Sequence, residues 1–234
     1  MFTFVTNKLR MELSLKIKMN EKLFLRNPEE SELGRKIVEF SIILIHRIGF
    51  EAFTFKKLAK EISATEAGVY RYFENKHRVL IYIVEWYWSW QEYRLRIQIN
   101  NIKNPEIKLK KAIRLISTPI EEDISTGHIN ENLLYEIVML EGAKSFLTKQ
   151  VTEDNKAKLF KPYKDFCAYV AKLILECNPK FKYPHSLSST IVEMAHSQNF
   201  YAKHLPSLTD FGNTKEEPKV ASFLEDMVFS TIKG

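Results

Sequence analysis

The chain has 234 residues, of which 45% are hydrophobic, 12% aromatic and 27% charged, and its formal net charge is +6. This composition excludes a disordered protein, because a chain so rich in apolar and aromatic residues can bury a core. It also indicates no membrane span. The best apolar runs, residues 40–45 and 79–84, end at His46 and Glu85, far short of the ~18 residues that a span needs.

The ends and the cysteines favour a cytoplasmic protein. The N-terminus has no secretory signal pattern, since its apolar residues precede the first basic residue. Cys167 and Cys177 lie in one predicted helix, ~15 Å apart along its axis, which is too far for a disulfide within the chain. The basic charge suits nucleic acid, but a solvated surface gives the same count.

Residues 1–30 differ from the remainder of the chain. Apolar and polar residues alternate over 13–19, and a polar stretch at 20–22 leads into Leu23. Period-two alternation around a polar turn predicts a short β-hairpin in this N-terminal extension.

We expect Ser31 to be an N-cap, and from this residue onward the apolar pattern is helical, so the fold class is all-α. We expect a three-helix helix-turn-helix head over residues 31–78 and a larger helical ligand-binding and dimerisation body over 79–234. The predicted helices are 31–49, 54–61, 65–73, 76–100, 105–117, 129–148, 153–177, 185–205 and 218–233.

The most informative segment is 54–73. Thr54 and Thr65 are good N-caps, and each opens a helix of about two turns on either side of a short turn at residues 62–64. Two short helices joined in this way are typical of a helix-turn-helix, in which the second helix enters the major groove of double-stranded DNA.

The second of these helices has a face suited to a DNA groove. Glu66, Gly68 and Arg71 lie on its outward face, whereas Val69 and Phe73 face inward. Arg71 can recognise a guanine edge and Glu66 can accept from a cytosine amine. Phosphate contacts are expected from Lys56, Tyr70, Tyr72 and Lys76, and from the helix N-terminus at Thr54. The complete set of predicted DNA-binding residues is Thr54, Lys56, Thr65, Glu66, Gly68, Tyr70, Arg71, Tyr72 and Lys76.

Residues 49–54, 57–59 and 68–76, reading GFEAFT, KLA and GVYRYFENK, resemble the DNA-binding head of tetracycline-repressor (TetR/AcrR-like) regulators. The resemblance covers about residues 33–85. Two positions depart from the family pattern: Ser63 stands where the turn usually has glycine, and the recognition helix begins TEAGVY. These departures leave the operator sequence open.

The resemblance implies a homodimeric repressor that a small-molecule effector releases from a pseudo-palindromic operator. It places dimerisation on the last two helices, about 184–205 and 218–233. The apolar positions there that could form a dimer seam are Ile191, Met194, Ala195, Phe200, Val220, Phe223, Leu224, Met227 and Val228.

The candidate effector-binding residues are Trp86, Trp90 and His128, although an aromatic run on a helix is more often core or interface. No metal or cofactor is expected, because His196 and His204 are offset by ~80° on one helix and cannot chelate one ion. The sequence contains no phosphate-binding glycine loop, nucleophile elbow or His-Glu-x-x-His motif, so we do not expect an enzyme.

Two alternatives remain from the sequence. One is a helical ligand-binding or protein-interaction module whose helix-turn-helix head is unused. The other is an activator or DNA-organising factor that has no effector.

Overall fold

The computed structural model describes residues 17–118, 128–212 and 219–233, and the regular structure within these ranges is entirely helical. None of the described helices is both long and apolar enough to cross a membrane. The α-helices are α1 (Glu32–Ala52), α2 (Phe55–Glu61), α3 (Glu66–Tyr70), α4 (Lys76–Ile99), α5 (Pro105–Ser117), α6 (Glu131–Glu141), α7 (Val151–Lys156), α8 (Lys161–Cys177), α9 (Pro184–His204) and α10 (Lys219–Lys233).

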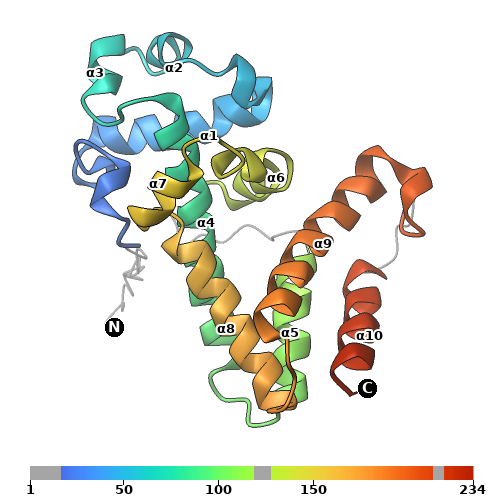
Figure 1. Cartoon of the computed structure of the whole chain (residues 1–234). Helices are drawn as coiled ribbons and strands as arrows, with labels where there is room; N and C mark the ends of the chain where they lie inside the picture. Colours follow the sequence, from blue (N-terminus) through green and yellow to red (C-terminus); the bar gives the residue numbers. More distant parts are fainter. Residues whose placement is uncertain (1–16, 119–127, 213–218, 234) are drawn as a thin grey trace, which may run out of the picture.

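The head consists of α1, α2 and α3, which lie together at one end of the molecule (Figure 1). Each of these helices begins at the predicted cap. Ser31, Thr54 and Thr65 accept hydrogen bonds from the backbone amides of residues 34, 57 and 68, at 3.0, 3.3 and 3.1 Å. The predicted N-caps are therefore confirmed, and each satisfies a backbone amide that the first helical turn leaves unpaired.

Helix α4 joins the head to the body and runs beside α8, while α5, α9 and α10 stand together on the far side of the body (Figure 1). Residues 79–88 of α4 are all buried, because α5, α6 and α8 pack against it. A helix that is apolar on every face needs such surroundings. The largest side chains of this core include Tyr82, Tyr87 and Trp90.

Three helix predictions were too long. The predicted helix 65–73 ends at Tyr70. The predicted helix 129–148 ends at Glu141, where a 3-10 helix, η4 (Gly142–Ser145), begins. The predicted helix 153–177 is divided into α7 and α8 because Lys158 adopts a left-handed backbone conformation, with φ 61°. A helix cannot continue through such a residue.

The predicted hairpin is wrong over its described part. Residues 17–30 contain two 3-10 helices, η1 (Glu21–Leu23) and η2 (Pro28–Glu30), while residues 1–16 lie outside the described ranges. Asn20 caps η1, and Leu23 is buried. Over the described residues 17–19, the alternation therefore reflects packing against the helices and not strand pairing.

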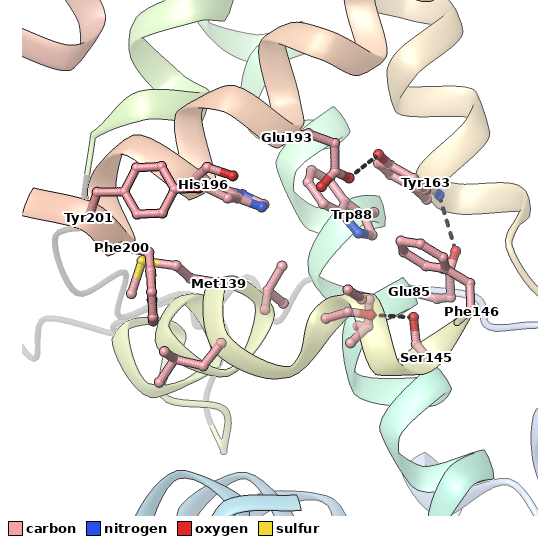
Figure 2. Close-up of a pocket in the computed structure, with 16 residues that line it drawn as sticks. Glu85, Trp88, Met139, Ser145, Phe146, Tyr163, Glu193, His196, Phe200 and Tyr201 are labelled. Carbon is pink, nitrogen blue, oxygen red and sulfur yellow. Dashed lines mark hydrogen bonds between the residues drawn. The ribbon is translucent and has the colours of Figure 1, made fainter. Parts of the chain in front are cut away.

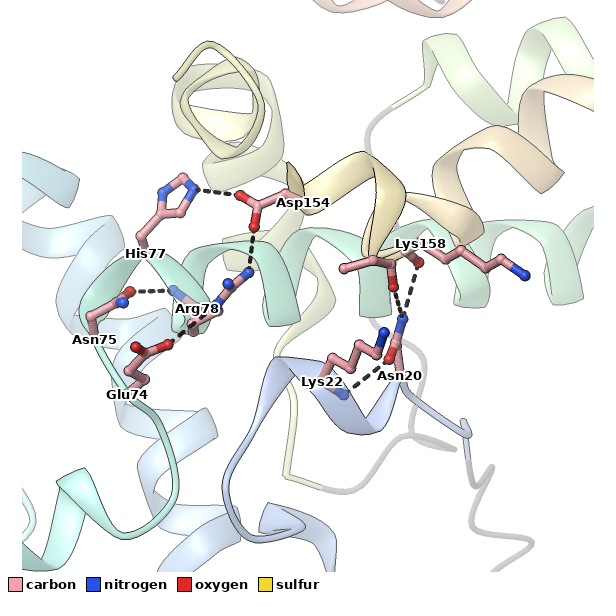
Figure 3. Close-up of polar contacts among 9 residues, drawn as sticks. Asn20, Lys22, Glu74, Asn75, His77, Arg78, Asp154 and Lys158 are labelled. Atoms are coloured by element: carbon pink, nitrogen blue, oxygen red, sulfur yellow. Dashed lines mark hydrogen bonds and ion pairs between the residues drawn. The ribbon is translucent and has the colours of Figure 1, made fainter. Parts of the chain in front are cut away.

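Close contacts fix this N-terminal segment to the protein. A Cβ atom at Gly34 would lie 2.3 Å from the Pro28 carbonyl oxygen, so only glycine permits η2 to pack so closely on α1. The Asn20 side chain donates to the carbonyls of Ala157 and Lys158, each at 3.1 Å (Figure 3).

A second polar contact joins the start of α4 to α7. The buried Asp154 carboxylate accepts from Arg78 at 2.8 Å and lies 3.9 Å from the His77 ring (Figure 3). Glu74 lies 3.7 Å from the same guanidinium. Because α4 begins immediately after α3, this cluster fixes the head to the body at its base.

Candidate nucleic-acid interface and ligand pocket

The turn between α2 and α3 is a tight helix C-cap. Ala64 donates from its backbone amide to the Ala59 carbonyl at 2.8 Å, and Ser63 donates to the Lys60 carbonyl at 3.3 Å. This is the Schellman pattern, whose central residue takes a left-handed conformation. Ser63 does so, with φ 53°. Serine in place of the usual glycine therefore keeps the turn geometry, but a residue with a side chain must adopt the strained left-handed backbone conformation.

Helix α3 presents a polar face to the outside of the head. The exposed members of the predicted DNA-binding set are Thr54, Lys56, Thr65, Glu66, Tyr70 and Arg71, and Gly68 is half-buried. Tyr70 is 48% exposed, and its ring packs edge-on against Phe55 at 4.9 Å between centroids. Packing on one side holds the tyrosine while its other side stays accessible.

Tyr72 does not belong to this exposed set, which corrects its predicted role in phosphate contact. The residue is 3% exposed, and its hydroxyl shares a 2.7 Å hydrogen bond with the Ser31 hydroxyl. Its backbone carbonyl accepts from Leu25 at 2.7 Å. Because α3 ends at Tyr70, the chain turns inward at residue 72 and not outward along the helix face.

Lys76 has an internal role in this structure. Its ammonium donates to the carbonyls of Phe50 and Glu51, at 3.0 and 2.9 Å, and lies 4.7 Å from the centre of the Phe50 ring. Two of its three donors are thus used by the end of α1. The predicted phosphate contact would have to use the remaining donor.

A pocket of about 330 Å³ opens in the body between α4, α6, η4, α8 and α9 (Figure 2). This volume lies within the range of small-molecule sites. Its lining consists of Val84, Glu85, Trp88, Val138, Met139, Leu140, Gly142, Ala143, Ser145, Phe146, Tyr163, Glu193, His196, Ser197, Phe200 and Tyr201.

None of the three predicted effector-binding residues lines this pocket. Trp86 and Trp90 lie on the opposite face of α4 from Trp88, and their rings stack on each other at 6.1 Å. His128 lies 3.4 Å from Glu29 in η2. The aromatic run thus contains one pocket residue, Trp88, while its neighbours form core.

Polar side chains, including two carboxyl groups, stand among the aromatic rings of the pocket. Glu85 is buried and accepts from the Tyr163 backbone amide at 3.1 Å, while Glu193 accepts from the Tyr163 hydroxyl at 2.9 Å (Figure 2). Burial raises the pKa of Glu85 to about 8, so this carboxyl group is mostly protonated at neutral pH.

His196 is another buried polar group of the pocket. Burial lowers its pKa to about 4, which keeps the imidazole neutral. Its Nε2 atom is buried and has no hydrogen-bond partner within the described residues. Buried polar atoms are nearly always paired, so this nitrogen is a candidate contact for a ligand.

Residues 37–83 match the family described as "Bacterial regulatory proteins, tetR family". These residues include all of α2 and α3 and most of α1. The segment is a tetR-family DNA-binding domain. The resemblance inferred from the sequence is thereby confirmed, and with it the helix-turn-helix assignment. No match was found among the curated proteins.

Solved structures show the same fold beyond the tetR-family domain. AibR, in complex with isovaleryl coenzyme A and operator DNA, is 18% identical, covers 83% of this chain and 98% of its own, and gives a TM-score of 0.55. The fatty acid degradation regulator FadR from Bacillus halodurans is 18% identical, covering 85% and 97%, with a TM-score of 0.55.

A third similar structure is a transcriptional regulator from Saccharomonospora viridis in complex with choline. It is 14% identical, covers 87% of this chain and 97% of its own, and gives a TM-score of 0.56. At these identities the comparisons establish a shared fold.

The pocket and the tetR-family domain are joined at the end of α6. Leu140 lines the pocket, and the next residue, Glu141, accepts from the Phe50 backbone amide at 2.9 Å. This contact depends on a kink in α1 at Gly49, whose φ of 76° and ψ of 157° turn the Phe50 amide away from the helical ladder. The Phe50 carbonyl is held by Lys76 at the start of α4.

Proposed function

We propose that this protein is a sequence-specific DNA-binding transcriptional regulator, a repressor whose operator affinity is lowered by a small effector bound in the body pocket. The observation that carries the proposal is the exposed polar face of α3 within a tetR-family domain. AibR supports it as a protein of the same fold in complex with both operator DNA and a small molecule.

In this proposal α3 enters the major groove. Arg71 donates to a guanine edge, and Glu66 accepts from a cytosine amine. Lys56 on α2 and Tyr70 at the end of α3, which are both exposed, contact phosphates and set the register of the helix on the duplex. Base contacts then determine the sequence, whereas phosphate contacts supply affinity.

Two copies would bind one operator through a dimer built on α9 and α10. Five of the predicted seam residues, Ile191, Ala195, Val220, Leu224 and Val228, are buried within the subunit and cannot contact a partner. The positions left for an interface are Met194, Phe200, Phe223 and Met227, which are partly or largely exposed. Phe223 is 41% exposed.

The effector would act through the contact of Glu141 with Phe50. The pocket wall includes residues 138–140 of α6, so a ligand that moves this wall also moves Glu141 and the end of α1. The effector can change the ratio of the operator-binding state to the released state only to the extent that its affinities for the two states differ. A ligand with equal affinity for both would leave operator binding unchanged.

Selection of bound duplexes from a random library tests the function directly. We expect enrichment of an inverted repeat whose half-site centres lie ~34–36 Å apart, or a multiple of that spacing. Arg71→Ala should relax the sequence preference at one base pair in each half-site. The control Lys149→Ala, which replaces a lysine outside the head, should leave the selected motif unchanged. A library that returns no motif would contradict the proposal and favour a module with an unused head.

A further inference from the structure

We propose that the ligand of the body pocket is an organic cation with apolar substituents, held between aromatic rings and the carboxyl groups of Glu85 and Glu193. The inference deepens the proposed function, because this cation would be the effector. The pocket residues alone indicate the ligand class.

Aromatic rings form much of the pocket wall. Trp88 lies 4.8 Å from Tyr163 and 5.6 Å from His196, measured between ring centroids, and Phe146 stacks on Tyr163 at 6.3 Å with an interplanar angle of 10°. Phe200 and Tyr201 line the wall on α9. The faces of such rings attract ammonium groups, most strongly where water is excluded.

The charges of the lining also favour a cation. The lining contains two carboxyl side chains, Glu85 and Glu193, and neither lysine nor arginine among the described residues that form it. A carboxylate or phosphate ligand would therefore lie near the Glu193 carboxylate with no counter-charge in the lining, which disfavours an anion. A cation would instead pair with the two carboxyl groups.

Nearby cations are engaged outside the pocket. Lys164, whose charge acts on Glu85, contacts Asn155, and Lys144, which follows the pocket-lining Ala143, pairs with Glu141 at 2.7 Å. His196 faces the pocket from α9 and is uncharged at neutral pH because burial lowers its pKa. None of these groups supplies a positive charge within the lining.

The cation should displace a proton from Glu85. Burial holds this group mostly protonated at pH 7, and a positive charge beside it favours the ionised form. The proton leaves to solvent, and the carboxylate pairs with the ligand. The groups of α8 that act on this carboxyl are the Tyr163 amide, Lys164, Asp165 and Cys167. From α9, the neutral His196 and the Glu193 carboxyl group lie in the same pocket. Ligand affinity should therefore rise with pH up to about 8.

The free nitrogen of His196 adds a polar contact. Its buried Nε2 has no partner in the described part of the chain, so a primary or secondary ammonium N–H could donate to it in the appropriate tautomer. A quaternary ammonium has no such donor. The position of this nitrogen between Trp88 and Tyr135 therefore favours ligands that carry at least one N–H.

Calorimetric titration of the full chain with three matched probes tests the ligand class. The probes are the secondary ammonium N-methylbenzylammonium, its uncharged carbon isostere propylbenzene, and the anion phenylacetate. We expect the cation to bind at least about tenfold more tightly than the isostere, a difference of ~1.4 kcal/mol, and phenylacetate not to bind. Equal binding of the isostere, tighter binding of phenylacetate, or a Kd for the cation above ~1 mM would overturn the proposal.

Two variants assign the charge effect to named residues. Glu193→Gln should weaken cation binding about tenfold, and Glu85→Gln should abolish both the rise in affinity with pH and proton release in buffers of different ionisation enthalpy. In the wild type we expect affinity to rise about fivefold from pH 7 to pH 8. Glu136→Gln is the matched control, because this acid lies on α6 outside the lining. A pH dependence that survives in Glu85→Gln would contradict the assignment.

These measurements contain no DNA, so they separate the ligand class from the regulator. Cation binding without any change in operator affinity would sustain the pocket proposal and remove the effector role. Selective operator binding by a protein that does not bind the cation would sustain the DNA-binding function and overturn the pocket proposal.

Discussion

Replacing Glu141 by alanine tests the contact that joins the pocket wall to the DNA-binding domain. The side chain is 13% exposed, and its Oε1 accepts from the Phe50 amide at 2.9 Å. Alanine would leave this amide without its partner where α1 is kinked and cannot supply a carbonyl. It would also remove the ion pair with Lys144.

The hydrogen bond dominates the expected loss. A hydrogen bond to a charged acceptor contributes ~1.5–3 kcal/mol, and an unpaired buried amide costs a similar amount. The Lys144 ion pair adds less than ~1 kcal/mol, because that lysine is 42% exposed and screened by solvent. We therefore expect Glu141→Ala to lower the free energy of unfolding by ~2–3 kcal/mol, or the Tm by roughly 4–10 °C.

Chemical denaturation of the wild type and three variants separates the contribution of the Phe50 hydrogen bond from that of the exposed ion pairs. Glu141→Gln keeps an acceptor for the Phe50 amide and should recover about half of the loss. Glu136→Ala is the control: this acid also joins α6 to α1, through His46 at 2.7 Å, but it is 35% exposed and should contribute less than ~1 kcal/mol. Equal losses for Glu141→Ala and Glu136→Ala would refute the argument that the Phe50 contact is the stronger link.

Four further outcomes follow from the structure. Arg71→Ala should cost ~1–3 kcal/mol on the selected operator and little on scrambled DNA, measured by anisotropy; equal losses on both would exclude base recognition. Ser63→Gly should raise the free energy of unfolding by ~0.5–1 kcal/mol in denaturant titration, because glycine relieves the left-handed strain; a loss would contradict this. Tyr72→Phe should cost ~0.5–1.5 kcal/mol of stability and leave operator affinity unchanged, whereas weaker DNA binding would restore its predicted phosphate role. For Glu85 the folded pKa of about 8 exceeds the ordinary 4.5, so its contribution to stability is lost as pH rises towards 8, by at most ~1.4 kcal/mol per pH unit; between pH 6.5 and 8 this decline should vanish in Glu85→Gln.

The sequence predicted those features of the head that depend on local interactions. Ser31, Thr54 and Thr65 were identifiable as caps because each bonds to an amide three residues away. The position of Tyr72 was not, because its direction depends on where α3 ends and on Ser31, which lies 41 positions earlier. Lys76 likewise contacts carbonyls 25 and 26 positions away, which no local pattern specifies.

The pocket could not be predicted from the sequence either, because its residues are brought together from distant parts of the chain. Its main polar groups come from α4 (Glu85) and from α8 and α9 (Tyr163, Glu193 and His196), which lie far from α4 in the chain. Trp86 and Trp90 were predicted as pocket residues because they are large aromatic side chains, yet they lie on the face of α4 opposite the pocket. One sequence signal did exist: Glu85 directly follows an apolar run, and an acid in such a place requires a special environment.

The central claim is that the exposed face of α3 binds a specific DNA sequence. The most direct test is an anisotropy titration of the full chain on its selected operator and on a scrambled duplex, at 50 and 200 mM salt. We expect selective binding that weakens by orders of magnitude between about 50 and 200 mM, as released counterions require, and a selectivity that Arg71→Ala reduces. Binding that is weak, equal for both duplexes and unaffected by Arg71→Ala would contradict the claim.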